Sequence, residues 1–375
     1  MRAQHPDPVT SATGRTTVAL DSPNDLLGWW DRWNTLAVQS GALIFRSPAW
    51  VAAWWEVLHP DDRVELLVRG DDQPDGLVAL ATGRRRLHPR LPIAPTVTVL
   101  AGSGVGAADH LGPVGVDAFT RRQLVADAVS HVGGRPLQLA ELSDEFGATA
   151  RALGATPIHQ RRCPAVALSP EAGPATWPRH LRKELRRRER RAAELGIERR
   201  WIRLDAGSSE PIGQLNRLHD AVWASRGRSG LSTSWRDELV LRVAEASTGD
   251  DGAWMQVLER DGMAVAALLG FRYGSTFCSY RTGWDPSLRS LGLGLLLHSD
   301  AIRRASSLGC GRYDFLRGTE PHKYTLGGVD AIESTSVVGR GVAGRLIVER
   351  ERRSAQRNAG AGWHERDSPA ASISG

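Results

Sequence analysis

Residues 284–305 read WDPSLRSLGLGLLLHSDAIRRA, and this segment is the most informative part of the sequence. A strand-like run, STFCSYRTGW at 275–284, leads through a turn and a glycine-rich loop into a helix expected over 291–308. Glycines let the backbone approach a ligand closely, and amides at the start of a helix favour an anion such as a pyrophosphate. The stretch therefore predicts an anion-binding loop of pattern R-x-x-G-x-G, whose residues are Arg289, Ser290, Leu291, Gly292, Leu293 and Gly294. The alternative is a glycine-softened loop with no ligand.

Strand-like and helix-like runs alternate on both sides of this loop. The second half is expected to contain helices at 179–196, 211–226, 235–246 and 291–308, and strands at 254–260, 263–274, 275–284, 312–316 and 333–339. The first half is expected to contain tryptophan-rich helices over 26–36 and 48–58, later helices near 121–132 and 144–153, and strands at 64–68, 76–83, 96–100, 136–142 and 163–168. This mixture predicts an α/β (α+β) fold with a mixed sheet in each half.

Polar stretches rich in proline, serine and glycine suggest where the halves begin and end. The segment SPEAGPATWP at 169–178 carries three prolines and is expected to be the boundary. Both chain ends are polar and are expected to be disordered tails. The predicted domains are a tail at 1–20, a first half at 21–168, a second half at 169–352 and a second tail at 353–375.

Composition excludes several classes of protein. A chain of 375 residues with 41% hydrophobic residues can bury a sizeable core, so a disulfide mini-scaffold and a disordered chain are excluded. No apolar run approaches the roughly 20 residues of a membrane span, and the N-terminal segment has no hydrophobic signal core. Cys163, Cys278 and Cys310 lie far apart without CxxC spacing, which predicts a reducing compartment and no metal. A cytoplasmic protein is expected.

The positive charge is local. The net charge is +6, and residues 179–195 alone hold eight Arg or Lys and three Glu. One interpretation is a solvated helix face with acidic partners, such as Glu184 and Arg188 at i,i+4. The other is a patch for an anionic substrate, namely a nucleotide-sugar, a tRNA acceptor end or a lipid-linked sugar. The first is favoured, and nucleic acid is not the expected partner.

A second polar motif follows the strand expected at 312–316. The stretch YDFLRGTEPHKYT at 313–325 contains Asp314, Glu320, His322, Lys323 and Tyr324. Lys323 is one of only two lysines beside 46 arginines, and a compact ammonium suits a phosphate or a polarised acceptor. The competing interpretation is a set of solvated loop residues, with Asp314 in a structural hydrogen bond. His298, on the apolar stripe of the 291–308 helix, is interpreted as a packed core histidine.

These motifs, in this order, resemble the GNAT N-acetyltransferase superfamily, whose acyl-CoA pyrophosphate loop has the pattern Q/R-x-x-G-x-G/A. The resemblance is closer to the branch of CelD-like proteins of polysaccharide biosynthesis and FemAB-like aminoacyl transferases. It is carried by RKELRRRERRAAELG at 182–196, GWDP at 283–286, RSLGLG at 289–294 and YDFLRGTEPHK at 313–323. His322 stands where the family pattern has tyrosine. The first half looks like a degenerate GNAT-like half, because members of this branch often carry two such units and this half has no R-x-x-G-x-G loop at the equivalent junction.

The resemblance implies an N-acyltransferase, most simply an N-acetyltransferase, that uses acetyl-CoA or another acyl-CoA and no metal. The acceptor would be an amine on a small molecule or on a cell-envelope or polysaccharide precursor. The loop 289–294 would bind the pyrophosphate, and backbone amides at the end of 275–284 would hold the pantetheine arm and the oxyanion. Tyr324 would be the general acid and Glu320 a base or an acceptor-orienting group, with Asp314 and Lys323 as further catalytic candidates.

Three alternatives remain open, and one of them is a basic nucleic-acid-binding module, whose binding would depend steeply on salt. A FemAB-like enzyme would take an aminoacyl group from tRNA, although the R-x-x-G-x-G loop suits a CoA pyrophosphate better. A non-catalytic binding protein on a GNAT scaffold would bind no acyl-CoA. The stretch GSGVGA at 102–107 formally fits a dinucleotide-binding pattern, but the sequence after it does not open a helix, so a Rossmann site is not expected.

Overall fold

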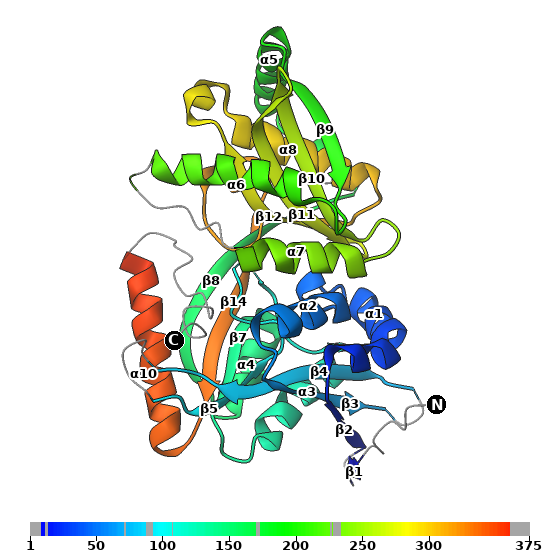
Figure 1. The fold of residues 1–375 in the computed structure, drawn as a ribbon, viewed down its shortest axis with the longest axis vertical. Helices are drawn as coiled ribbons and strands as arrows, with labels where there is room; N and C mark the ends of the chain where they lie inside the picture. The colour runs from blue at the N-terminus through cyan, green and yellow to red at the C-terminus, as the bar shows by residue number, and fades with distance from the viewer. Residues whose placement is uncertain are drawn as a thin grey trace. The chain divides into compact units, whose positions relative to one another are not determined.

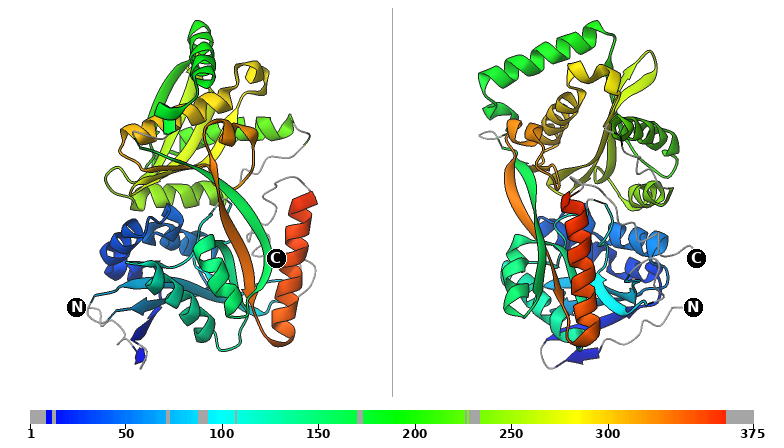
Figure 2. Two further views of the ribbon diagram at one scale, coloured as in Figure 1. Left: turned by 180° about the vertical axis from the view of Figure 1, so that it is seen from behind. Right: turned by 90° about the vertical axis from the view of Figure 1, so that its left-hand side faces the viewer.

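The computed structural model describes residues 9–11, 14–70, 73–87, 93–106, 108–169, 173–225, 227 and 234–360. The chain forms two compact units (Figure 1). The first unit consists of Met1–Arg161 and Ile332–Gly375, and the second is Arg162–Ala331. The chain passes between them within strands β8 (Thr156–Ala167, green) and β14 (Val329–Val338, orange; Figure 2). No helix among the described residues is long and apolar enough to cross a membrane.

The first unit is a mixed sheet with helices. Its strands follow the order β1-β2-β3-β4-β5-β7-β14, with β6 beside β4, and the β5–β7 pair is parallel. The strands are β1 (Val9–Ser11), β2 (Arg15–Leu20), β3 (Arg63–Arg69), β4 (Gly76–Arg84), β5 (Thr96–Leu100), β6 (Val114–Gly115) and β7 (Leu137–Ser143). The helices are α1 (Trp30–Gln39), α2 (Pro48–Leu58), α3 (Ala118–His131), α4 (Asp144–Ala152) and α10 (Gly341–Gly360).

The tryptophans of α2 are core residues, as the helical spacing predicts. Ser47 caps the helix by accepting a hydrogen bond from the Trp50 amide at 3.1 Å. Trp50 and Trp54 are fully buried, and their indole N–H groups donate to the carbonyls of Gly102 and Ser103 at 3.0 and 2.9 Å. Part of the glycine-rich stretch after β5 therefore supplies hydrogen-bond acceptors for the tryptophans of α2. The next helix starts only at Ala118, as expected for a loop that is not a dinucleotide site.

The second unit is also a mixed sheet. Its strands follow the order β8-β13-β12-β11-β10-β9, and only β12 and β13 among these neighbours are parallel. The strands are β9 (Glu198–Arg203), β10 (Gly252–Arg260), β11 (Met263–Tyr273), β12 (Thr276–Trp284) and β13 (Arg312–Asp314). The helices are α5 (Arg179–Glu194), α6 (Ser209–Ala224), α7 (Ser234–Ala246), α8 (Leu293–Ser307) and α9 (Pro321–Thr325).

Helix α8 is fixed to the sheet by both apolar and polar contacts. Its inner face buries Leu297 and Ile302 completely. Asp300, also buried, accepts hydrogen bonds from the Gln256 amide at 2.7 Å and the Trp201 indole at 3.2 Å, and it pairs with Arg199. Burial raises the pKa of the Asp300 carboxyl. These contacts to β9 and β10 hold the start of α8, and so the predicted loop, in a defined place.

A β-bulge shapes β12. Leu269 of β11 pairs with Arg281, but the next residue, Gly270, pairs with Ser279, so Tyr280 is an extra residue. A Cβ atom on Gly270 would overlap the Phe277 ring and the Cys278 carbonyl, which explains the glycine opposite the bulge.

The structure corrects both predicted tails. Residues 15–20 form β2, which pairs with β3 along its whole length and with β1 on its other side, because the β-branched residues of TTVAL favour a strand. At the other end α10 continues to Gly360, with Ile347 buried and an i,i+4 pair between Glu349 and Arg353. The remaining tail residues, 1–8, 12–13 and 361–375, lie outside the described part of the chain.

Other expectations hold with small changes. The helices predicted over 179–196 and 291–308 are α5 and α8. The strand predicted at 312–316 ends at Asp314, because Leu316 has a left-handed backbone (φ 56°). The short helix α9 was not predicted.

We predict that Gly270→Ala lowers the free energy of unfolding by about 1–3 kcal/mol, because the added methyl group has no space beside the bulge. The matched control is Gly213→Ala in α6, where a Cβ meets no heavy atom within 4 Å. That variant should gain up to about 1 kcal/mol, because alanine favours a helix. Urea denaturation followed by tryptophan fluorescence compares the two, and equal midpoints would contradict this account of the bulge.

Candidate active site

The predicted loop 289–294 lies where the 3-10 helix Pro286–Leu291 meets α8. Asp285 begins the 3-10 helix by accepting a hydrogen bond from the Ser287 amide at 2.9 Å. Gly292 has a left-handed backbone (φ 65°) and starts α8, and its carbonyl accepts hydrogen bonds from the Leu295 and Leu296 amides. The amides of the first helical turn have no carbonyl before them in the helix, so they are available to an anion.

The two glycines of the loop differ in what they require. Gly292 needs its glycine for two reasons, the left-handed backbone and the Arg188 guanidinium that fills the space beside it. Gly294 is helical, and a Cβ there would meet nothing closer than the Trp284 ring at 3.8 Å. Because glycine weakens a helix, packing does not explain Gly294, whereas close approach of a ligand to the backbone does.

Arg188 of α5 reaches the loop. Its Nη1 donates to the Leu291 carbonyl at 2.8 Å, and its Nε donates to Glu184 at 2.7 Å. Arg187 pairs with the same carboxylate, and hydrogen bonds from Arg187 and then Arg188 lower the pKa of Glu184 to about 2. The predicted i,i+4 pair of Glu184 and Arg188 is therefore present. The contact with the loop is a finding of the structure that helical spacing alone did not indicate.

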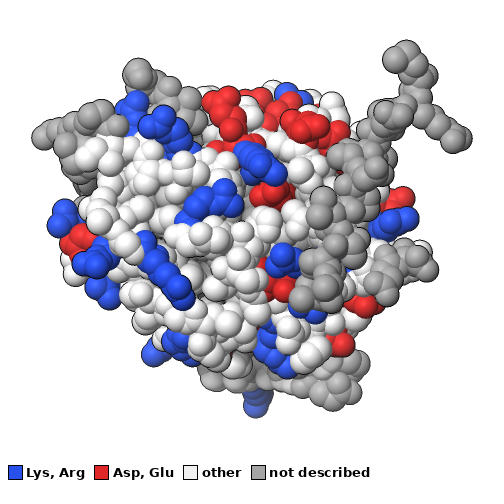
Figure 3. Space-filling model, turned by 90° about the horizontal axis from the view of Figure 1, so that it is seen from below, with Lys and Arg blue, Asp and Glu red and all other residues white. Residues whose placement is uncertain are grey.

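Helix α5 also carries a row of cations on the face opposite its buried leucines. The members are exposed and make no ion pair with the described residues: Arg179, Arg182, Lys183, Arg186 and Arg190. By contrast, the face drawn in Figure 3 shows both basic and acidic side chains. The favoured expectation of a helix face with acidic partners is thus correct for Arg187 and Arg188 only.

Strands β12 and β13 separate soon after they pair. Their parallel pairing runs from Thr276 opposite Arg312 to Cys278 opposite Asp314. β12 then continues as Ser279–Trp284, here called the β12 edge, and no described strand pairs with this segment on the side of β13. Six extended residues span about 20 Å. The β12 edge therefore runs, with no described strand beside it on that side, to a point just before the loop 289–294, and its Thr282 carbonyl lies 3.0 Å from His219 Nδ1.

A tight turn diverts the chain after β13. The buried carboxylate of Asp314 accepts hydrogen bonds from the Leu316 amide at 2.8 Å and from Arg312 at 2.5 Å. The left-handed backbone of Leu316 costs energy that these bonds offset. Asp314, proposed from the sequence as a catalytic residue, is a structural residue of this turn.

The Lys323 ammonium closes the same turn. Lys323 is 5% exposed, and its Nζ donates to four backbone carbonyls and contacts Glu320 at 3.0 Å. The carbonyls belong to Phe315 (3.2 Å), Leu316 (3.1 Å), Arg317 (2.7 Å) and Gly318 (3.3 Å). We call this arrangement the carbonyl cage. It corrects the predicted role of Lys323, because an ammonium surrounded by carbonyls has no donor left for a phosphate. It also explains a lysine among arginines, since a planar guanidinium does not fit a compact cage.

Glu320 and Tyr324 are the more accessible of the four predicted catalytic residues. Glu320 precedes α9, and its side chain is about half exposed. The Tyr324 hydroxyl donates to Asp330 at 2.8 Å, and this bond raises the pKa of Tyr324. Arg162 also contacts Asp330, at 3.3 Å. A tyrosine committed to a carboxylate is a poorer proton donor to a thiolate than a free one.

Two histidines stack on each other, and one of them, His322, belongs to the second polar motif of the sequence. His298 of α8 is buried, as predicted for a core histidine, and its Nδ1 lies 2.9 Å from the Tyr313 hydroxyl. The His322 ring from α9 stacks on it, with ring centroids 4.9 Å apart. Tyr313 is also hydrogen-bonded to Ser279, the first residue of the β12 edge. The pair therefore lies where β12 and β13 separate.

Burial keeps both imidazoles neutral. It is the largest influence on each and lowers the pKa of His298 far below its ordinary value and the pKa of His322 below it. The Lys323 charge lowers both values further, and Glu320 raises that of His322. Near pH 7 both rings are therefore uncharged.

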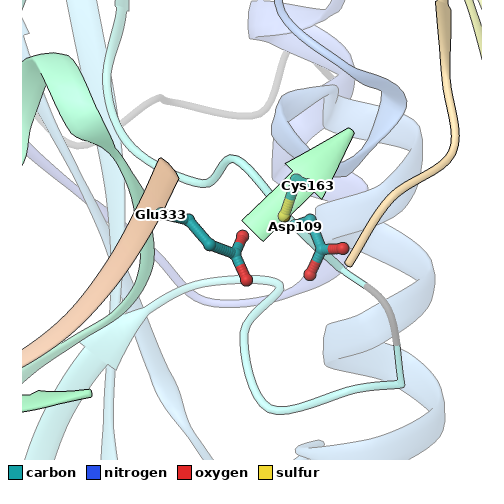
Figure 4. Close-up of side chains that lie close together, drawn as sticks. All are labelled: Asp109, Cys163 and Glu333. Carbon is teal, nitrogen blue, oxygen red and sulfur yellow. The ribbon is translucent and has the colours of Figure 1, made fainter. Parts of the chain in front are cut away.

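Another buried polar group lies in the first unit. Asp109 and Glu333 are both fully buried, and their carboxylate oxygens lie within 4.8 Å (Figure 4). The His110 amide donates to Glu333 at 3.2 Å. None of these residues belongs to the loop 289–294 or to the turn after β13, and we assign them no part in the candidate active site.

Comparisons with known proteins agree with this fold. A family model described as an acetyltransferase (GNAT) domain matches residues 179–324, which include α5, the loop and the carbonyl cage. FemX has a similar structure, with a TM-score of 0.59 and 10% identity over 81% of this chain and 95% of that chain. L-PGS from Bacillus licheniformis has a TM-score of 0.52 and 13% identity over 86% and 96%. No curated protein matches the sequence.

A third similar structure is the C-terminal DUF2156 domain of a putative lysylphosphatidylglycerol synthetase from Agrobacterium fabrum. It has a TM-score of 0.51 and 12% identity over 84% of this chain and 96% of that chain. At such identities the likeness shows the fold alone. Because each structure covers more than four fifths of this chain, the likeness includes residues of both units. The predicted α/β class is confirmed, and residues 179–324 match a GNAT domain by sequence.

We predict that Lys323→Met lowers the free energy of unfolding by about 3 kcal/mol, because several buried carbonyls lose their donor at once. The chain provides a matched control in its other lysine. Lys183 is exposed on α5, and Lys183→Met should change stability by less than about 0.5 kcal/mol. Urea titration measures both, and a Lys323 variant as stable as the Lys183 variant would contradict the structural role of the cage.

Proposed function

We propose that the second unit transfers an acyl group from acyl-CoA, most simply acetyl-CoA, to an amine. One observation carries the proposal: the β12 edge leads directly to a glycine-containing helix start, Gly292–Gly294. A long ligand with an amide-containing arm and a diphosphate suits both parts. The arm can pair with the strand edge, and the diphosphate can accept from the first amides of α8. The GNAT match over 179–324 supports the same assignment.

The groups along this line have distinct tasks in the proposal. Backbone N–H groups near the Tyr280 bulge hold the thioester carbonyl and stabilise the oxyanion that forms on attack. The amides of Leu293 and Gly294 bind the diphosphate, and Arg188 adds a charge-assisted contact beside them. Glu320 and Tyr324 are accessible enough to orient an acceptor amine. These positions are the basis for proposing acyl transfer to an amine. The identity of the acceptor depends on the side chains that contact it.

We also propose a class of acceptor and a cellular compartment. An amine on a small molecule or on a cell-envelope or polysaccharide precursor would place the protein in the CelD-like branch. The cytoplasm would be its compartment, consistent with three buried cysteines that form no disulfide. We also propose that the first half, 21–168, is a degenerate GNAT-like half without a loop of its own.

Aminoacyl transfer from tRNA is the second candidate function, and one observation favours it. The cation row on α5, from Arg179 to Arg190, suits a chain of phosphates. RNA that co-purifies with the protein and dissociates steeply with salt would favour this candidate. Binding of acetyl-CoA without RNA would favour acyl transfer.

Gly294→Ala tests the anion site through two effects of opposite sign. The variant should be more stable by about 0.5 kcal/mol, because alanine suits a helix better and has space there. Binding of acetyl-CoA should weaken by about tenfold or more, because the methyl group lies where the diphosphate approaches the backbone. Denaturation and calorimetric titration measure the two effects. A variant that binds acetyl-CoA as the wild type does would contradict the assignment.

We also predict that Arg188→Gln weakens binding of acetyl-CoA and CoA by about 10- to 100-fold, because a charge-assisted contact to phosphate contributes about 1.5–3 kcal/mol. Arg187→Gln is the matched control, since Arg187 pairs with Glu184 but donates to no loop carbonyl. Pantetheine, which lacks the diphosphate, should not distinguish the variants. Tighter binding by Arg188→Gln would mean that Arg188 obstructs the loop.

A further inference from the structure

The stacked histidines of the second unit have no task in the function proposed above. His298 belongs to α8 and His322 to α9, and both contact residues where β12 and β13 separate. Phe315 packs against both rings, with centroids 5.3 Å from His298 and 6.3 Å from His322. The carbonyl cage fixes the position of His322, because Lys323 is its neighbour in the chain. A titratable ring is thus held firmly next to the start of the β12 edge.

One nitrogen of this pair is unsatisfied. The Nε2 atom of His322 is buried and has no hydrogen-bond partner among the described residues. A buried polar atom without a partner costs about 1–3 kcal/mol. Such atoms in native proteins call for an explanation, and a role in binding or catalysis is a frequent one. A hydrogen-bond partner for this nitrogen therefore has to come from a ligand or a water.

We propose that His322 is a catalytic residue, whose Nε2 accepts the proton of the acceptor amine and then returns it to the leaving thiolate. The proposal rests on the acyl-transfer function and adds its acid–base group. Two observations support it: the unsatisfied nitrogen, and the stacking of His322 on His298, whose ring contacts Tyr313, which is hydrogen-bonded to Ser279 at the start of the β12 edge.

A single histidine can both take up and return the proton in this reaction. The amine nitrogen attacks the thioester carbonyl carbon, the C–N bond forms, and the amine proton passes to Nε2. The tetrahedral oxyanion then collapses, the C–S bond breaks, and the imidazolium gives its proton to the sulfur. The products are the amide, free CoA thiol and a neutral imidazole. A base near its working pH typically contributes about 10²–10⁴-fold.

The charges around His322 suit a base that starts neutral. Lys323, fixed in the carbonyl cage, disfavours a positive charge on His322, and Glu320 opposes it. Tyr313, the titratable group of β13 that contacts His298, is buried and neutral, with a raised pKa. Burial and the Lys323 charge together outweigh Glu320, because the pKa of His322 is lowered. A tyrosine at this position, as in the family pattern, would be a far weaker base at neutral pH.

S-bromoacetyl-CoA is the probe for proximity, because its reactive carbon takes the place of the acyl group. We expect it to alkylate His322, with a new N–C bond and loss of bromide, and mass spectrometry of peptides will locate the label. His322→Phe should lose the label while still binding acetyl-CoA in calorimetry. His180→Phe, a change at an exposed histidine of α5, should be labelled at His322 like the wild type.

Kinetics provide the readout that a purely structural role would not move. Thiol release from acetyl-CoA, with glucosamine as the amine probe, is measured from pH 5 to 8. The wild type should lose activity towards the acidic end of this range, because the pKa of His322 is lowered and its ring becomes protonated only below the ordinary histidine value of 6.5. His322→Phe should lower kcat by about 10²-fold or more at an unchanged KM for acetyl-CoA, and its profile should lack the acidic limb.

The outcomes separate this inference from the function beneath it. A folded wild type that binds no acyl-CoA overturns both. Binding of acetyl-CoA with the label on another residue overturns only the role of His322. The same follows if His322→Phe retains the wild-type kcat and acidic limb, and in that case the buried nitrogen is satisfied by a water.

Discussion

The short pairing of β12 with β13 is the constraint on which the second unit depends. Three parallel pairs hold the strands together, and after Cys278 and Asp314 they separate. The turn that diverts β13 is held by the Asp314 carboxylate and by the Lys323 ammonium. If β13 continued beside β12, its backbone would satisfy the β12 edge and leave nothing for a ligand. The buried charges of the turn therefore keep the site open.

Positive charge gathers at the end of the β12 edge that lies near the loop 289–294. The start of α8 carries the positive end of the helix dipole, and Arg188 places a guanidinium beside it. Two positive groups side by side repel, and Glu184 offsets only part of that repulsion because it also pairs with Arg187. An anion in front of the loop relieves the remainder. The neutral histidines lie at the opposite end, so charge binding and proton transfer are assigned to separate ends of one strand.

Local patterns predicted the elements and the loop, because a helix start and its glycines depend on neighbouring residues. The sequence indicated α5, α8 and the mixed class correctly, whereas residues 289–291 of the expected loop belong to a 3-10 helix. It did not indicate the carbonyl cage. The cage requires the left-handed backbone of Leu316, and the residue types in that turn do not predict this conformation. The stack of His298 on His322 needs two helices to meet. The strand β2 was missed because half of its residues are polar and only Leu20 in it is buried.

The cage also links stability to chemistry. Lys323 closes the turn, and the same charge lowers the pKa of the neighbouring His322. A chain that used an uncharged residue there would lose the turn and also leave a histidine that protonates more readily. Glu320 moderates the effect, because it contacts Lys323 and raises the pKa of His322. The sequence His322-Lys323 thus joins the proposed proton acceptor to a charge that adds to the effect of burial, which is the largest cause of its lowered pKa.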